Sequence, residues 1–167
     1  MKQAMINYIK NVKNDELYTP VEGILPLLKY LPKDFIYWEC TDFGDSNITK
    51  VLKNNGYKII TTHINTGFDF LKDEPNFDFD CIITNPPYSK KDKFLERAYE
   101  LGKPFCFLLP ITALEGVNRG KLYRKYGIEV LVLDRRLNFM KNKKGTWFNT
   151  SWFCWKILPE KLIFESI

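Results

Sequence analysis

The sequence predicts an α/β protein in which a mostly parallel sheet is covered by helices on both faces. Short runs of continuous apolar residues alternate with stretches whose apolar residues recur at helical spacing. Polar motifs follow the ends of the apolar runs, which is where ligand crevices lie in parallel sheets. No repeat, low-complexity tract or linker rich in proline, glycine and serine divides the chain. We therefore expect a single domain over residues 1–167.

The expected strands are continuous apolar runs rather than alternating ones, which is typical of strands that are buried on both faces. The first helix should begin at Pro20, because Thr19 to Glu22 has the form of a capping box. Pro26 should keep this helix short or kinked. Further helices are expected before Asn55-Gly56, over 94–101 and over 112–125. Strands are expected over 35–39, 57–62, 79–84, 104–109, 128–133 and 148–158.

The charge of the chain is unevenly distributed. The net charge is +5, but residues 1–84 carry nine lysines, no arginine and twelve acidic residues, a net of −3. Residues 85–167 carry sixteen basic and eight acidic residues, a net of +8, which indicates a polyanionic partner for one face. A low-GC genome explains the same bias, since twenty of the 25 basic residues are lysine. Charge alone leaves both explanations open.

Composition argues against several classes of protein. No apolar run approaches the roughly 18 residues that a membrane helix needs, and the first residues are too polar for a secretory signal. The four cysteines are far apart and form no CxxC pair, and His63 is the only histidine. We therefore expect reduced cysteines in a cytoplasmic protein, with no membrane segment and no metal site.

Three polar loops follow predicted strands, at 39–46, 63–70 and 85–89. In the first loop Glu39 ends a strand, Gly44 follows, and a helix then begins. A carboxylate at this position can bind hydroxyl or ammonium groups, and a glycine lets a ligand approach the backbone. This is the plan of a nucleoside site, although an acid, a loop and a glycine also occur together by chance.

Asn85-Pro86-Pro87-Tyr88 is the strongest single signal in the sequence. Two consecutive prolines have no backbone N–H to donate to a sheet or a helix, so we expect a rigid strand end at which the carbonyl groups of Asn85 and Pro86 point outward. A stiff turn would account for the prolines. It would not account for the amide and the aromatic ring on either side of them.

This tetrapeptide follows Tyr18-Thr19-Pro20, Trp38-Glu39, Gly44-Asp45 and Asp69-Phe70 in order. The set resembles the motifs of the class I S-adenosylmethionine-dependent adenine-N6 DNA methyltransferases, especially the short forms of phages and mobile elements. The resemblance covers residues 16–157. It implies a Rossmann-like class I methyltransferase fold with a seven-stranded sheet, one strand antiparallel, and a bacterial or phage-infected cytoplasm as its setting.

The resemblance also implies a role for each motif. The Asn85 side-chain oxygen and the Pro86 carbonyl would accept the two amino hydrogens of adenine, and Tyr88, after Pro87, would stack on the flipped base. Phe139 is the candidate for a second stacking ring. S-adenosylmethionine is the implied cofactor, and its implied binding residues are Tyr18, Thr19, Pro20, Glu39, Cys40, Thr41, Gly44, Asp45, His63, Asp69 and Phe70. The implied nucleic-acid contacts are Lys90, Lys91, Arg135, Arg136 and Phe139.

The chain departs from the family's pattern in the cofactor loops. Gly44-Asp45 is followed by Ser46, where the family usually has two glycines with one residue between them. His63 stands where an acidic residue usually binds the ribose hydroxyls, and it loses the paired acceptance of a carboxylate. We expect no separate target-recognition domain within these 167 residues. We therefore expect low sequence specificity, or a partner protein that supplies it.

Three functions remain open at this point. The first is methylation of the N6 amino group of adenine in DNA or in RNA, with DNA favoured. The second is the same fold acting on a protein glutamine or another amine, since such enzymes share the Asn-Pro-Pro-Tyr motif, although the basic second part of the chain favours nucleic acid. The third is a catalytically degenerate phage-type binding or inhibitor protein, for which the altered glycine loop and His63 are the best support.

Overall fold

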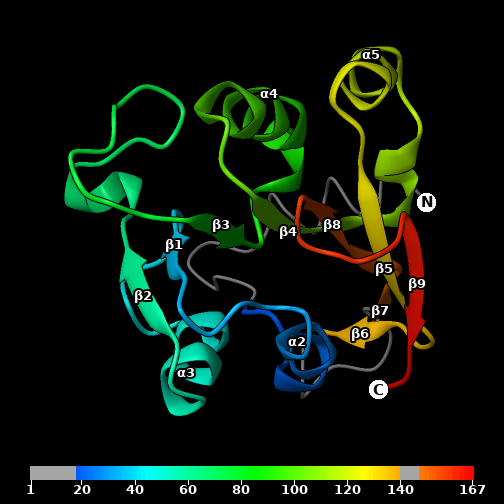
Figure 1. Ribbon diagram of the computed structural model, residues 1–167, viewed down its shortest axis with the longest axis horizontal. Helices are drawn as coiled ribbons and strands as arrows, with labels where there is room; N and C mark the ends of the chain where they lie inside the picture. Colours follow the sequence, from blue (N-terminus) through cyan, green and yellow to red (C-terminus); the bar gives the residue numbers. More distant parts are fainter. Residues whose placement is uncertain (1–17, 140–146) are drawn as a thin grey trace.

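The structure is a computed structural model that describes residues 18–139 and 147–167. Its centre is a seven-stranded sheet in the order β2-β1-β3-β4-β8-β5-β9 (Figure 1). Strand β8 is antiparallel to both of its neighbours, and the other neighbouring strands of this sheet run parallel. The strands are β1 (Ile36–Glu39), β2 (Lys58–Thr61), β3 (Cys81–Thr84), β4 (Phe105–Pro110), β5 (Glu129–Leu133), β8 (Thr150–Trp155) and β9 (Leu162–Glu165).

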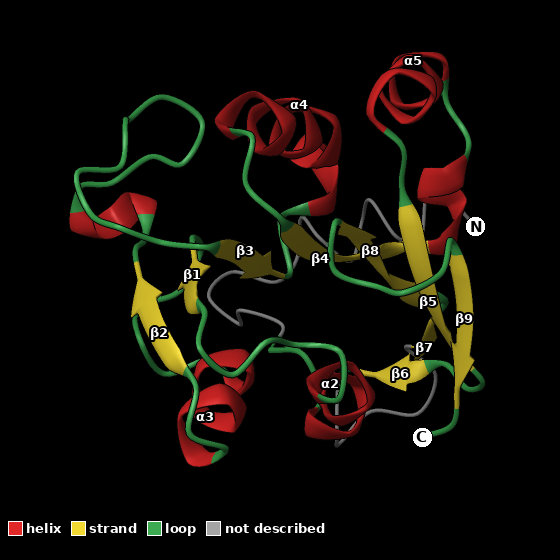
Figure 2. Cartoon of the chain, viewed as in Figure 1, coloured by secondary structure: helices red, strands yellow, loops and turns green. Residues whose placement is uncertain are grey.

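Helices cover both faces of the sheet (Figure 2). One face carries α2 (Val21–Leu28) and α3 (Asn47–Asn54), and the other carries α4 (Lys91–Leu101) and α5 (Val117–Tyr126). The predicted fold class, with its parallel sheet, single antiparallel strand and two helical layers, is therefore confirmed. The short elements are η1 (Ile64–Thr66), η2 (Tyr88–Lys90), η3 (Ile111–Leu114), β6 (Leu137–Asn138) and β7 (Trp147–Phe148).

Two apolar clusters fill the space between the sheet and its helices. Along β4, Cys106 and Leu108 belong to the cluster on the side of α2 and α3, whereas Phe105, Phe107 and Leu109 belong to the cluster on the side of α4. All five side chains are fully buried. Because successive residues of a strand point to opposite faces, a strand that is covered on both sides has to be apolar throughout.

Trp38 in β1 is surrounded by four phenylalanines from the segment that follows η1. The ring centroids of Phe68, Phe70, Phe77 and Phe79 lie 5.6, 5.3, 5.2 and 4.9 Å from that of Trp38, all in edge-on arrangements. Such aromatic pairs add to the stabilisation that comes from buried area alone. The cluster therefore holds residues 68–79, which form neither helix nor strand, against the sheet.

The first turn of α2 differs from the expected capping box. The helix begins at Val21 with Pro20 as its N-cap, and no side chain caps it. The Thr19 hydroxyl is buried and has no hydrogen-bond partner among the described residues. Pro20, which has no N–H, has replaced the threonine at the capping position, so the hydroxyl has no role in starting the helix.

The contact between α2 and β6 is unusually close. A Cβ atom added at Gly23 would collide with the side chain of Leu137, which is buried. The Gly23 carbonyl accepts a hydrogen bond of 2.7 Å from the indole nitrogen of Trp152 in β8. The missing side chain at Gly23 thus allows the helix, the β6–β7 pair and the main sheet to meet at one point.

The helix expected over 112–125 is two elements. The turn η3 ends at Leu114, and α5 begins only at Val117, after Gly116. Gly116 has a φ of +131°, a conformation that side chains rarely adopt and that cannot continue a helix. The interruption is therefore built into the backbone at this glycine.

The strand expected over 148–158 is also shorter, because β8 ends at Trp155. The Glu129 carboxylate accepts hydrogen bonds from the backbone nitrogens of Lys156, Ile157 and Leu158, at 3.0, 3.0 and 2.8 Å. These bonds fix a turn that leads the chain into β9, which pairs with β5. The apolar pattern of the sequence did not predict β9.

We expect Glu129→Ala to lower the free energy of unfolding by about 2 kcal/mol, because three backbone donors would lose a charged acceptor. Urea denaturation measures the change. Glu160→Ala is the matched control, since this exposed glutamate makes none of the hydrogen bonds of the turn. Equal unfolding midpoints for the two variants would contradict the structural role of Glu129.

Candidate active site

The carboxyl ends of the parallel strands β1, β3, β4 and β5 lie along one edge of the sheet. Glu39 is the last residue of β1, and Asn85 follows β3 directly. Arg135 and Arg136 follow the end of β5. The predicted nucleoside loop, the tetrapeptide and the arginine pair therefore share an edge, which is the usual place for a ligand crevice in such sheets.

A chain of hydrogen bonds joins Glu39 to the residue before the tetrapeptide. Glu39 is only 2% exposed. Its Oε1 accepts hydrogen bonds from the backbone nitrogen and the hydroxyl of Thr41, both at 3.0 Å. The Thr41 hydroxyl lies 2.7 Å from that of Thr84, the last residue of β3. The first loop and the Asn85 turn are thus held in a fixed relation.

The Glu39 carboxyl titrates far from the usual range. Burial raises its pKa to about 8, although hydrogen bonds with Thr84 and Thr41 favour the ionised form. At neutral pH the carboxyl is therefore largely protonated. Burial also raises the pKa of the neighbouring Cys40 thiol, which disfavours its nucleophilic thiolate form.

Asp42, which the sequence analysis did not single out, builds the loop between β1 and α3. Its Oδ1 accepts hydrogen bonds from the backbone nitrogens of Asp45 and Ser46, at 3.3 and 3.1 Å, and its Oδ2 accepts one from the Thr49 hydroxyl. Burial opposes ionisation, but these bonds lower the pKa of Asp42 below its usual value. Gly44 lies inside the turn with a φ of +105°.

The residues before α2 contact this loop and the start of α3. The Tyr18 hydroxyl donates a hydrogen bond of 2.9 Å to Oδ1 of Asp45. The side-chain amide of Asn47 donates one of 2.9 Å to the Thr19 carbonyl. Pro20, next in the chain, is buried. The structure therefore brings Tyr18 and Thr19 against Asp45 and Asn47, which follow them in the sequence by 27 and 28 residues.

His63 follows β2 and contacts the first loop through Phe43. The two rings are stacked, with centroids 3.8 Å apart and an interplanar angle of 28°. The His63 Nδ1 accepts a hydrogen bond of 3.0 Å from the backbone nitrogen of Asn65. Phe43 is 48% exposed, which is high for a stacked ring. The sequence analysis singled out His63 but not Phe43, so it did not predict this pair.

Asp69 and Phe70 are in different environments. The Phe70 ring is 3% exposed and stacks on Phe94 with centroids 4.9 Å apart, so its side chain belongs to the core. Asp69 accepts a hydrogen bond from the Leu71 backbone nitrogen at 3.0 Å and pairs with Lys72 at 3.3 Å. Burial opposes ionisation, but these contacts lower the pKa of Asp69. Cofactor binding by these two residues stays a prediction.

The four residues of the tetrapeptide differ in solvent exposure. Asn85 is half-buried, Pro86 is buried, and Pro87 is exposed before η2. The Tyr88 ring packs against the cluster on the side of α4, and its hydroxyl is buried with no partner among the described residues. Burial also raises the pKa of this hydroxyl. To stack on a base, the Tyr88 ring would have to turn out of this position.

The predicted nucleic-acid contacts are spread along the edge. Lys90 is exposed. The ammonium group of Lys91 donates a hydrogen bond of 3.2 Å to the Tyr88 carbonyl. Phe139 packs against the cluster on the side of α2.

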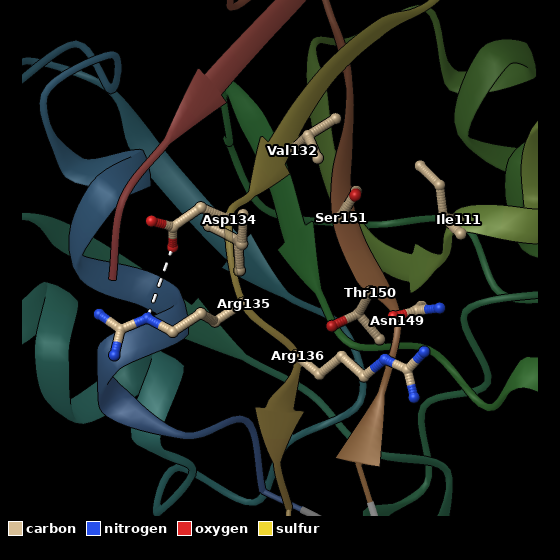
Figure 3. Close-up of a pocket in the computed structure, with 9 residues that line it drawn as sticks. Ile111, Val132, Asp134, Arg135, Arg136, Asn149, Thr150 and Ser151 are labelled. Atoms are coloured by element: carbon tan, nitrogen blue, oxygen red, sulfur yellow. Dashed lines mark ion pairs between the residues drawn. The ribbon is translucent and has the colours of Figure 1, made fainter.

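The arginine pair divides into two different environments. The Arg135 guanidinium lies 3.7 Å from the Asp134 carboxylate. Arg136, in contrast, lines a hollow between the ends of β4, β5 and β8 (Figure 3).

In the part of the chain that the structure describes, no three acidic, histidine or cysteine side chains are grouped to hold a metal ion. No helix of that part is long and apolar enough to cross a membrane.

Several solved structures with a similar fold are described as methyltransferases. The chain is 16% identical to the methyltransferase subunit of a type I restriction-modification system from Streptococcus thermophilus, with a TM-score of 0.56 over 98% of this chain and 50% of that chain. It is 12% identical to a protein from Listeria monocytogenes assigned as a class I S-adenosylmethionine-dependent methyltransferase, with a TM-score of 0.54 over 99% and 72% of the two chains. A Pyrococcus horikoshii protein assigned as an RNA methyltransferase is 13% identical, with a TM-score of 0.52 over 95% and 98%.

At these identities the likeness defines the fold, which is the Rossmann-like class I methyltransferase fold. The chain spans about half the length of the Streptococcus thermophilus subunit. No known family model and no curated protein matches the sequence. Acceptor and cofactor therefore have to be argued from the site itself.

The buried Glu39 carboxyl predicts a pH dependence of stability. Its pKa is about 8 in the folded chain and 4.5 as the ordinary value. The folded chain therefore binds the Glu39 proton more tightly than the unfolded chain does. The contribution of this proton to the free energy of unfolding is fully present below pH 4.5 and is lost as the pH rises toward 8, by at most about 1.4 kcal/mol per pH unit. Glu39→Gln, which imitates the protonated carboxyl, should remove this dependence.

Thermal unfolding from about pH 5 to about pH 9 measures the effect. The wild-type chain should lose stability relative to Glu39→Gln up to about pH 8, after which the difference should be constant. Glu160→Gln, at an exposed position, should follow the wild-type curve throughout. A difference between wild type and Glu39→Gln that does not change with pH would show that Glu39 is ionised in the folded chain.

Proposed function

We propose that this chain is an S-adenosylmethionine-dependent methyltransferase that methylates the N6 amino group of adenine in DNA. The observation that carries the proposal is the hydrogen-bonded link from Glu39 through Thr41 to Thr84, which couples a nucleoside-type loop to Asn85-Pro86. The fold, which is shared with methyltransferases, supports the same conclusion.

The residues around the first loop fit S-adenosylmethionine. Glu39 offers a carboxyl for hydroxyl or ammonium groups, and its raised pKa means that binding would release its proton. The buried Thr19 hydroxyl, without a partner among the described residues, is an unmet donor close to the loop. Because the Nδ1 of His63 accepts a hydrogen bond, the proton of the neutral ring is on Nε2, where it can be donated to a ribose oxygen.

The tetrapeptide supplies the other half of the chemistry. The N6 lone pair of adenine is delocalised into the ring, so the amino group is a weak nucleophile. Hydrogen bonds from both amino hydrogens to the Asn85 Oδ1 and the Pro86 carbonyl would favour a tetrahedral nitrogen with a localised lone pair. S-adenosylmethionine, when bound, supplies an electrophilic methyl group. The alkylated nitrogen is acidic and loses its proton to water, so no strong base is required.

A catalytically degenerate protein that binds nucleic acid is the second candidate. The stacked Phe43 and His63, the single glycine of the first loop and the buried position of Tyr88 favour it. A protein amine as acceptor is the third, and it is disfavoured by the net charge of +8 on residues 85–167. Whichever acceptor applies, a partner protein could supply sequence specificity.

We expect calorimetric titration to show one S-adenosylmethionine bound per chain. Glu39→Gln should weaken this binding about tenfold or more, because a carboxylate that accepts two hydrogen bonds would be replaced by an amide that accepts fewer. Glu160→Gln serves as the control. The absence of binding by the wild-type chain at millimolar cofactor would exclude both enzymatic functions and favour the degenerate protein.

We expect Asn85→Ala to reduce methyl transfer to adenine at least about 100-fold, because one acceptor of the amino hydrogens is removed. Its affinity for S-adenosylmethionine should not change. Asn76→Ala, at an exposed asparagine of the 68–79 segment, should leave both quantities unchanged. Radiolabel transfer to DNA, RNA and protein identifies the acceptor, and full turnover by Asn85→Ala would mean that the tetrapeptide is only a turn.

A further inference from the structure

The hollow at the ends of β4, β5 and β8 has a volume of about 260 Å³. It is lined by Ile111, by residues 132–136 at and after the end of β5, and by residues 149–151 at the start of β8. Figure 3 shows their side chains around the opening. This volume is below the roughly 300–1,000 Å³ of most small-molecule pockets, so the hollow suits a single small group.

The charges around the hollow do not cancel. Asp134 pairs with Arg135 at 3.7 Å and also accepts a hydrogen bond of 3.1 Å from the Ile167 backbone nitrogen. Arg136 has no ion pair with any described residue. Its side chain extends toward Thr150 and Asn149 in Figure 3, whereas that of Arg135 extends toward Asp134. The hollow therefore has one uncompensated positive charge.

Thr150 provides a second, independent feature of the same hollow. The residue is 4% exposed, and its hydroxyl has no hydrogen-bond partner among the described residues. Thr150 lies opposite Pro110 in the β4–β8 pair. A buried hydroxyl without a partner destabilises the fold, and an isosteric valine would fill the same space without that penalty. One hollow is thus lined by a buried hydroxyl and by a guanidinium that has no ion pair with any described residue, and both groups can bind an oxygen-rich anion.

The hollow is close to the tetrapeptide. Ile111 follows β4, which is the immediate neighbour of β3, and Asn85 follows β3. With strands about 4.8 Å apart, the hollow lies about 5–15 Å from Asn85 along the edge. A backbone phosphate of the strand that carries a flipped base fits this distance, since phosphates flank every nucleotide.

We propose that this hollow binds one backbone phosphate of the nucleic-acid strand that carries the target base, through Arg136 and Thr150. The inference rests on the proposed function, because it takes the position of the base from Asn85. It goes further in separating the two arginines: Arg136 contacts the phosphate, while Arg135 is held by Asp134.

Fluorescence anisotropy with a labelled adenine-containing oligonucleotide tests the proposal. Arg136→Gln should weaken binding about tenfold and reduce the slope of log K against log salt by about one. Arg124→Gln is the matched control, since it removes the same charge from an exposed position on α5. Equal losses of affinity and slope in the two variants would mean that the arginines act only through the general field, and would overturn the proposal.

The variant Thr150→Val distinguishes a role of this hydroxyl in oligonucleotide binding from a role in stability. We expect it to weaken oligonucleotide binding several-fold without lowering the thermal unfolding temperature, because its hydroxyl has no partner among the described residues. A lower unfolding temperature with unchanged binding would show that the hydroxyl is structural and would overturn the site.

Methyl transfer by the same variants distinguishes this proposal from the proposed function. A wild-type chain that transfers methyl groups, with an Arg136→Gln variant that binds like Arg124→Gln, overturns the phosphate site alone. A wild-type chain that transfers none, with binding that still depends on Arg136 and Thr150, overturns the proposed function and supports the phosphate site. In an active enzyme, Arg136→Gln should raise the KM for the oligonucleotide and leave the affinity for S-adenosylmethionine unchanged.

Discussion

The central strands of the sheet are covered by helices on both faces, and the arrangement of polar groups in this protein depends on that constraint. A strand such as β4, whose neighbouring side chains enter two different apolar clusters, has no face on which a polar residue can reach water. Polar side chains are therefore confined to the strand ends. Glu39 lies at the boundary between the apolar interior and the polar edge. Its carboxyl is buried there, and this burial raises its pKa.

The first loop has only one glycine, and hydrogen bonds to its side chains hold its backbone in place. Asp42 binds the turn from within, and Ser46 accepts a hydrogen bond of 3.2 Å from the Thr49 backbone nitrogen to cap α3. Tyr18 then closes the outside of the loop through Asp45. A departure from a familiar glycine pattern is thus accompanied by a polar network that orders the same segment.

The sequence was most informative where a pattern was both local and repeated. Continuous apolar runs predicted six strands of the main sheet, and the polar residues after them predicted the shared edge. Strand β9 was missed because its residues alternate between exposed and half-buried, as an edge strand allows. The positions of Phe70 and Tyr88 were not predictable, since an aromatic residue beside a motif reads the same whether it faces a ligand or the core. The stacking of Phe43 on His63 joins two loops, and no short-range pattern encodes it.

The absence of a side chain at Gly23 restricts which segments can be exchanged in this protein. The β6–β7 pair lies on α2 through Leu137, and the space that it occupies exists only because position 23 has no side chain. A hairpin transplanted from another protein between β5 and β8 would have to present an apolar side chain of similar size at 137. Conversely, a helix exchanged for α2 would have to keep glycine at 23. The two segments form a matched pair, so they are exchangeable together and not one at a time.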